Sequence, residues 1–185
     1  ESPQHIIGSI KHTLRQEASV NTRPIYDDPV ALLQHLLKFD TTNPPGNEAA
    51  CIGYIRSLLN NAGIETTIVA KDPNRPNLIA RLKGRGEAPP FLMYGHVDVV
   101  TTEYQNWAHP PFAGEIIDGY LWGRGTLDMK GGVTMMLSAF LRAKAEGLQM
   151  PGDVILTILS DEEAGSDMGA RFVVEEHPEH FEGVR

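Results

Sequence analysis

Residues 91–132 read FLMYGHVDVVTTEYQNWAHPPFAGEIIDGYLWGRGTLDMKGG, and this stretch decides the fold of the chain. It opens with an unbroken apolar run that ends at His96, which is typical of a short strand covered on both faces. A loop rich in proline and aromatic residues follows. Asp118-Gly119 is then a strong type I′ turn signal and predicts a hairpin. The stretch closes at Asp128, where a helix is predicted to begin, so two residues with metal-binding side chains stand at the ends of elements.

The elements on either side of this stretch alternate between helix and strand. Apolar residues at helical spacing predict a helix that begins near Asp27 and Asp28, with Pro29 at its first helical position, and further helices over residues 48–60, 128–146 and 166–176. Runs of β-branched or other apolar residues predict strands over residues 64–70, 77–82, 91–96 and 153–159. Alternation of this kind is typical of a sheet covered by helices. We therefore predict a three-layer α/β/α sandwich with a mixed, mostly parallel sheet, mixed because the hairpin adds antiparallel strands.

The composition is that of an ordinary globular protein. Of 185 residues, 41% are hydrophobic and 22% are charged, and the formal net charge is -8. This acidity argues against nucleic acid as a partner, because phosphate binding needs clustered Lys and Arg. No apolar run approaches the roughly 18 residues of a membrane span, the N-terminus lacks a signal-peptide pattern, and one cysteine rules out an internal disulfide. These features predict a soluble, cytoplasmic protein without a membrane partner.

A second acidic cluster, SDEEAGS at residues 160–166, follows another predicted strand. In α/β sheets ligands bind beyond the carboxyl ends of the strands. We therefore expect His96, Asp128 and the pair Glu162-Glu163 to converge at one edge of the sheet. One imidazole together with several carboxylates suits Zn²⁺, Co²⁺ or Mn²⁺.

Such a cluster has the parts of a hydrolytic site. Asp98 lies two residues after His96, so both side chains point to the same side of an extended backbone, and the carboxylate can hold the ring N–H of the imidazole. Asp128 can bridge two ions, and ions roughly 3.5–4 Å apart can activate a water and polarise a carbonyl group. One glutamate of the 162–163 pair can then bind metal while the other accepts a proton.

Each of these features also has a structural explanation. A buried His–Asp hydrogen bond accounts for His96 and Asp98, Asp128 can serve only as a helix N-cap, and two successive glutamates are usually solvated. The Gly-rich passage that ends at Gly132 lacks the spacing of the phosphate-binding motifs, and no G-x-S-x-G motif supports a serine hydrolase. Taken singly, the residues leave a metal site and a structural role both open.

Four motifs in this order resemble the M20 metallopeptidases. They are YGHVDVV (94–100), W-x-x-x-PF (107–112), DG-x-LWGRGTLDMKGG (118–132) and SDEE-x-GS (160–166), and FDTTNPPGNE (39–48) resembles the N-terminal region of the family. The family includes aminoacylases, acetylornithine deacetylases, succinyl-diaminopimelate desuccinylases, glutamate carboxypeptidases and dipeptidases. The resemblance covers the chain from Asp27 to its end and implies a zinc-peptidase-like fold.

The resemblance implies a role for each residue of the cluster. His96 would bind one metal ion, Glu163 would bind the other and Asp128 would bridge both, while Asp98 would orient the imidazole. Glu162 would be the general base for a metal-bridging water that attacks the amide carbonyl of a small peptide or an N-acyl amino acid. The implied cofactors are two divalent ions, zinc or alternatively cobalt or manganese. The peptide bond after the bridging aspartate is typically cis in this family.

The resemblance also implies that the site is shared with residues outside this chain. In the family a further carboxylate ligand, a second metal-binding histidine and a small lid and dimerisation domain come later. Residues 25–185 would therefore be the N-terminal part of a catalytic domain, inactive alone, preceded by an extension over residues 1–24, and homodimers would form through the lid. Thr101 replaces the usual proline after the D-V-V motif. The alternative function is a non-catalytic metal- or peptide-binding protein on the same fold.

Overall fold

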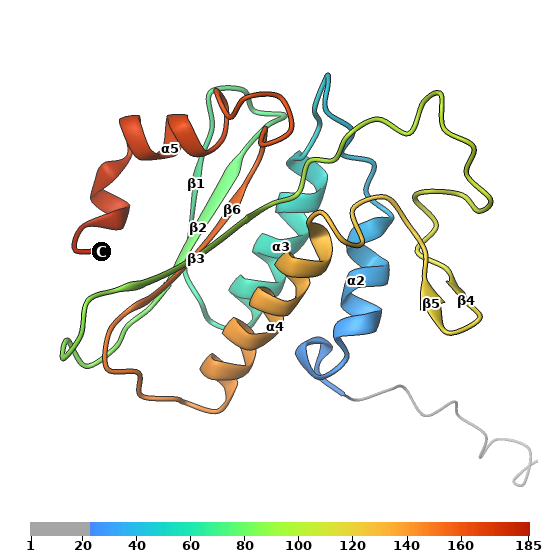
Figure 1. Ribbon diagram of the computed structural model, residues 1–185. Helices are drawn as coiled ribbons and strands as arrows, with labels where there is room; N and C mark the ends of the chain where they lie inside the picture. Colours follow the sequence, from blue (N-terminus) through green and yellow to red (C-terminus); the bar gives the residue numbers. More distant parts are fainter. Residues whose placement is uncertain (1–22) are drawn as a thin grey trace, which may run out of the picture.

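The computed structural model describes residues 23–185 and arranges them around a four-stranded sheet (Figure 1). In order across the sheet, the strands are β1 (Thr66–Val69), β2 (Asn77–Leu82), β6 (Val154–Leu159) and β3 (Phe91–His96). Two short strands, β4 (Ile116–Ile117) and β5 (Tyr120–Leu121), form a separate hairpin. The helices are η1 (Ile25–Asp27), α2 (Pro29–Leu37), α3 (Ala49–Asn61), α4 (Lys130–Ala145), α5 (Ala170–Glu176) and η2 (Pro178–Phe181).

Two further predictions concern the N-terminal extension and membrane spans. The predicted extension over residues 1–24 lies almost entirely outside the described residues. Within residues 23–185, none of the helices combines the length and the apolar character that crossing a membrane requires.

Local signals set the start of α2 as predicted. Pro29 occupies the first helical position, and the side chain of Asp28 accepts a hydrogen bond of 3.0 Å from the backbone N–H of Ala31. This bond satisfies one of the first N–H groups, which have no partner inside the helix. The buried side chains of α2 are Leu32, Leu36 and Leu37.

Two helices begin at least two residues later than predicted, and both shifts affect the candidate site. Met129 has a non-helical φ of -132°, so α4 starts at Lys130 and Asp128 precedes the helix instead of belonging to it. Ser166 has a left-handed φ of 65°, and Gly169 is also outside the helical region, so α5 starts only at Ala170. The acidic turn after β6 is therefore followed by a longer loop than expected.

The sheet is mixed, as predicted, but for a different reason. β1–β2 and β2–β6 are antiparallel and only β3–β6 is parallel, so the described part of the sheet is not mostly parallel. The predicted hairpin does form, with positive φ at Asp118 (52°) and Gly119 (82°) as a type I′ turn requires. However, it stays apart from the main sheet. The antiparallel pairs come from β2, which runs against both of its neighbours.

Helices cover both faces of the sheet and form the predicted three layers (Figure 1). On one face, α3 and α4 pack their apolar side chains against the strands, and α2 packs beside α4; all three helices contribute to the larger hydrophobic cluster. On the other face, α5 contributes Phe172 and Val173 to a smaller cluster. Because β2 and β6 lie between these two clusters, their residues are buried in almost every position.

The prediction that β3 is covered on both faces is wrong for its first four residues. β3 forms one edge of the sheet, and its only strand partner within residues 23–185 is β6. Phe91 and Tyr94 are each 63% exposed, whereas His96 at the other end is 4% exposed. An apolar run reports a tendency to be buried, but it does not report whether a neighbouring strand is present to bury it.

Candidate metal centre

The carboxyl ends of β3 and β6 lie side by side, because His96 pairs with Leu159 in parallel register. The imidazole of His96 is buried, and its Nδ1 lies 3.0 Å from the backbone carbonyl oxygen of Asp98 and 3.3 Å from the carboxylate of the same residue. Since a carbonyl oxygen can only accept a hydrogen bond, Nδ1 carries a proton. Nε2 is thus the nitrogen left for another partner.

Carboxylates gather at this second nitrogen. Oδ1 of Asp128 lies 3.3 Å and Oε2 of Glu162 lies 3.8 Å from Nε2 of His96. Potential ligand atoms of His96, Asp128 and Glu163 all lie within 4.8 Å of one another. The side chain of Asp128 is 78% exposed and that of Glu162 is 54% exposed, so the carboxylates form the solvent side of the cluster. The structure brings together all four side chains predicted to bind metal or to act as the base.

Asp98 connects the segment that follows β3 to the turn that follows β6. Its buried carboxylate accepts hydrogen bonds from the side-chain amide of Asn43 (2.8 Å) and from the backbone N–H groups of Glu162 (3.1 Å) and Glu163 (3.0 Å). Burial raises the pKa of Asp98, but hydrogen bonds from His96, Asn43 and the two backbone groups outweigh it and hold the pKa below its ordinary value. Beyond the predicted contact with His96, Asp98 therefore also positions the turn that carries both glutamates.

A buried polar network below the site was not predicted. Asn43 is 3% exposed, and its amide also donates to Oδ1 of Asp161 at 3.1 Å. Arg75 lies 3.0 Å from the same oxygen and forms two hydrogen bonds with Glu48, at 2.9 and 3.2 Å. Asn43 and Glu48 belong to the FDTTNPPGNE segment, which the family resemblance singled out without assigning a role. Arg75 carried no signal at all, because its partners lie far away in the sequence.

The charge balance of the cluster favours a bound cation. Burial lowers the pKa of His96, but the hydrogen bonds and charge of Asp98 and the charge of Glu162 outweigh it and raise the pKa to about 9. Burial also raises the pKa of Glu163, and the carboxylates of Asp128, Asp98 and Glu162 add to this rise against the effect of His96. One imidazole among crowded carboxylates is a donor set that suits Zn²⁺, Co²⁺ or Mn²⁺. The residues present therefore fit a divalent metal ion.

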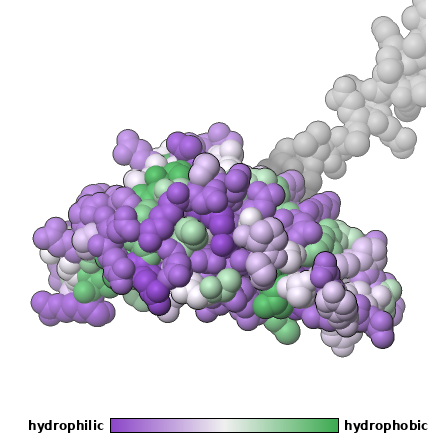
Figure 2. All heavy atoms as spheres, turned by 90° about the horizontal axis from the view of Figure 1, so that it is seen from above, coloured by the Kyte–Doolittle hydropathy of each residue, from purple (hydrophilic) through white to green (hydrophobic). Residues whose placement is uncertain are grey.

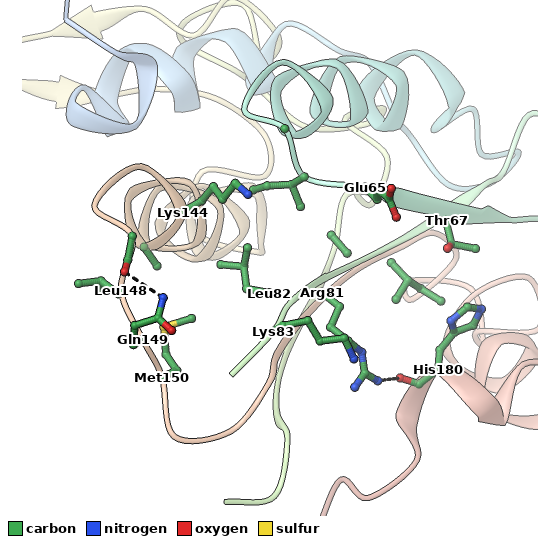
Figure 3. A pocket seen from close by; sticks show the side chains of 16 residues that line it. Glu65, Thr67, Arg81, Leu82, Lys83, Lys144, Leu148, Gln149, Met150 and His180 are labelled. Atoms are coloured by element: carbon green, nitrogen blue, oxygen red, sulfur yellow. Dashed lines mark hydrogen bonds between the residues drawn. The ribbon is translucent and has the colours of Figure 1, made fainter. Parts of the chain in front are cut away.

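The face above this cluster is largely polar. Figure 2 shows the molecule from above, on the side where β6 ends, and hydrophilic residues predominate there. A pocket of about 700 Å³ lies elsewhere, between β1, β2 and the C-terminal part of α4 (Figure 3). None of the predicted site residues lines that pocket.

The sequence matches peptidase family M20/M25/M40 over residues 92–184, which is half of its length. The chain belongs to peptidase family M20. The matched region contains all five residues of the predicted site. As the resemblance implied for this family, the Asp128-Met129 peptide bond is cis.

Named proteins similar to this M20 chain are all considerably longer. A succinyl-diaminopimelate desuccinylase from Cereibacter sphaeroides is 40% identical over 146 residues, and the match covers 77% of this chain but 37% of the relative. The structure of an M20 metallo-carboxypeptidase from Sulfolobus solfataricus superposes with a TM-score of 0.73 at 20% identity, covering 84% of this chain and 36% of that one. A dinuclear metal-binding M20 peptidase from Bacillus subtilis superposes with a TM-score of 0.57 at 22% identity, covering 81% and 38%. These likenesses confirm the predicted α/β fold.

We expect Asn43→Leu to destabilise the fold and to loosen the metal centre. The substitution leaves a carboxylate oxygen of Asp98 and one of Asp161 without their amide donor, which costs about 1–3 kcal/mol. Groups that orient metal ligands typically contribute about 10–100-fold to metal affinity. Urea denaturation and a zinc titration of the full-length protein measure the two effects. Asn106→Leu, at an exposed position, is the matched control, and equal stability and affinity in both variants would contradict the role of Asn43.

Proposed function

We propose that the full-length protein hydrolyses an amide bond in an N-acyl amino acid or a small peptide, using two divalent metal ions. The observation that carries this proposal is the convergence of His96, Asp128 and Glu163 within 4.8 Å, with a carboxylate of Glu162 beside them. Membership of the M20 family supports it, since the similar proteins include a desuccinylase and a metallo-carboxypeptidase.

The ligand set divides between the two ions as follows. His96 would hold one ion through Nε2, because Nδ1 is engaged by Asp98. Asp128 would be shared by both ions, and Glu163 would hold the second ion. When bound, such ions lower the pKa of a water and stabilise negative charge on a carbonyl oxygen. Zinc is the proposed metal, and cobalt or manganese would be accepted by the same donors.

Glu162 is the proposed general base. Its backbone N–H is fixed by Asp98, while its carboxylate is half exposed and reaches the edge of the cluster at 3.8 Å from Nε2 of His96. In this position it can take a proton from the attacking water as the water oxygen bonds to the carbonyl carbon. It then delivers that proton to the amide nitrogen, so that the carbon–nitrogen bond breaks and a neutral amine leaves.

Residues 25–185 are, in our proposal, the N-terminal part of the catalytic domain. The chain spans 37% of the length of the similar desuccinylase. The outer edge of β3, which pairs with no strand within residues 23–185, offers a place for further strands to pair, and Phe91 and Tyr94 of this strand are exposed. The remaining ligands, the substrate contacts and a lid through which homodimers form would lie in the rest of the full-length protein. Residues 25–185 alone would then be inactive.

Metal removal tests the proposal. We expect treatment of the full-length protein with a chelator to reduce hydrolysis to background, and zinc, cobalt or manganese to restore it, because the charge-stabilising groups are the ions. The assay is amine release from a panel of N-succinyl, N-acetyl and N-formyl amino acids and dipeptides. Full activity after complete metal removal would contradict the proposal. Metal binding without hydrolysis of any panel member would instead support the non-catalytic binding protein.

A further inference from the structure

A second group of metal-binding side chains lies at the end of α5. The helix ends at Glu176, and Pro178 then begins the short helix η2, whose backbone is closed by a hydrogen bond of 3.3 Å from the N–H of His180 to the carbonyl of His177. In a 3₁₀ turn, side chains three positions apart lie on the same side. This turn therefore brings two imidazoles together, with Glu179 between them in the sequence.

The spacing of these three side chains suits a metal ion. Oε1 of Glu179 lies 3.6 Å from Nδ1 of His177 and 3.6 Å from Nε2 of His180, and potential ligand atoms of the three residues all lie within 4.8 Å of one another. Bonds of about 2.0–2.2 Å to a tetrahedral ion separate neighbouring ligand atoms by about 3.3–3.6 Å. At 3.6 Å, both contacts between Glu179 and the histidines are too long for nitrogen–oxygen hydrogen bonds. A pair of ordinary His–Glu hydrogen bonds does not account for the arrangement.

The body of the protein holds both histidines in place. The ring of His177 packs edge-on against Phe172, with ring centroids 5.1 Å apart and planes at 87°. The backbone carbonyl of His180 accepts a hydrogen bond of 2.6 Å from Arg81 of β2, which Figure 3 shows reaching across from the sheet. The side chains of His177 and His180 are 29% and 26% exposed, so they are largely fixed and yet accessible to an ion from solution.

The local charge also favours a cation. Residues 175–182 read EEHPEHFE and carry four carboxylates and no lysine or arginine. The two neighbouring cations each have a carboxylate partner outside the group: Lys71 pairs with Glu176 at 3.2 Å and lies over the ring of Phe172, and Arg81 pairs with Asp153 at 2.8 Å. Glu179 takes no part in either pair. Its carboxylate is 63% exposed and is available to complete the group.

This group is separate from the metal centre at His96. Arg81, which holds the turn, pairs with Ile155 near the start of β6, whereas His96 pairs with Leu159 at the end of that strand. The rise of about 3.3 Å per strand residue places the two levels roughly 13 Å apart along the sheet. In addition, α5 and η2 lie on the face of the sheet opposite to α4, whose start follows Asp128 (Figure 1).

We propose that His177, Glu179 and His180 form an additional binding site for a divalent transition-metal ion, with Zn²⁺ as the best match. Two imidazoles and one carboxylate with a water in the fourth position make up a set that zinc accepts. Copper and nickel also bind imidazole well and would compete for it. The ion would link the end of α5 to η2 and would stabilise that part of the fold by mass action. The site is independent of the proposed hydrolytic function.

Metal stoichiometry tests this site. The untagged full-length protein is freed of metal and titrated with zinc against a chromophoric chelator, beside the variants Glu179→Gln, His180→Asn and the double variant. We expect each variant to bind one zinc equivalent fewer than the unaltered protein. We also expect zinc to raise the Tm of each variant by less than it raises the Tm of the unaltered protein. Catalytic metal content and amide hydrolysis should stay unchanged, which shows that the variants are folded.

Matched controls test whether the lost zinc equivalent belongs to this site, rather than to the acidic segment in general or to the catalytic centre. Glu175→Gln removes a carboxylate from the same segment, and His109→Asn removes a histidine that belongs to neither group of metal-binding side chains. Both should retain the additional equivalent. The catalytic-centre variant Asp128→Asn should retain it as well, even if it binds no catalytic metal. Equal stoichiometry in the unaltered protein and in the Glu179 and His180 variants would overturn the proposal.

Discussion

Glu162→Gln is expected to lower kcat for amide hydrolysis by about 10²- to 10⁴-fold, the range that a positioned general base contributes. Glutamine keeps the shape of the side chain, and the backbone N–H of residue 162 still binds Asp98 at 3.1 Å. The amide of glutamine cannot accept the proton of the attacking water. The proposed metal ligands His96, Asp128 and Glu163 are untouched, so we expect metal content and KM to change little.

Steady-state kinetics of the full-length protein, with metal analysis of the same samples, measures this effect. Glu175→Gln on the surface of α5 is a control for the loss of one carboxylate. Glu163→Gln is an informative contrast, because it should lower metal affinity as well as rate. If Glu162→Gln kept full activity at full metal occupancy, the base would have to be another group.

Arg75→Met should destabilise the protein by about 3–5 kcal/mol, the usual cost of removing one partner of a buried ion pair. The Arg75 guanidinium bonds twice to Glu48, whose side chain is 0% exposed, and lies 3.0 Å from the carboxylate of Asp161. The hydrogen bond to Glu48 raises the pKa of Arg75, and although burial lowers it, the charges of Glu48 and Asp161 add to the rise. Methionine fills a similar volume but leaves both carboxylates buried without a counter-charge.

Urea denaturation of the full-length protein tests this value. Arg56→Met, at an exposed position on α3, is the matched control and should cost little. The double variant Arg75→Met/Glu48→Leu should recover part of the lost stability, because one of the two unpaired carboxylates is then gone. A loss below about 1 kcal/mol for Arg75→Met would mean that water reaches these carboxylates and the network is not dry. Because Arg75 contacts Asp161, which directly precedes Glu162 and Glu163, we also expect Arg75→Met to weaken metal binding.

Local chemistry made most elements predictable. The bounds of β2 and β3 and the first residue of α2 agree with the sequence prediction, because strand runs and a Pro after an Asp cap act over a few residues. The positive φ at Asp118 and Gly119 follows in the same way from two residue types. The sequence could not reveal that β3 is an edge strand or that β4 and β5 stand apart, because pairing depends on what lies beside a strand.

The same distinction between local signals and long-range contacts holds for the candidate site. By itself, the sequence determined the membership of the M20 family and the residue types of the site, because the motifs around His96, Asp128 and Glu162 are contiguous. Only the tertiary structure showed that Asp98 binds the glutamate turn and that Asn43 and Arg75 support it, through contacts that span 55 and 65 residues for Asp98 alone. It also decided that His177 and His180 face one carboxylate. Such contacts depend on distances in space between side chains, and the order of residues along a chain does not contain those distances.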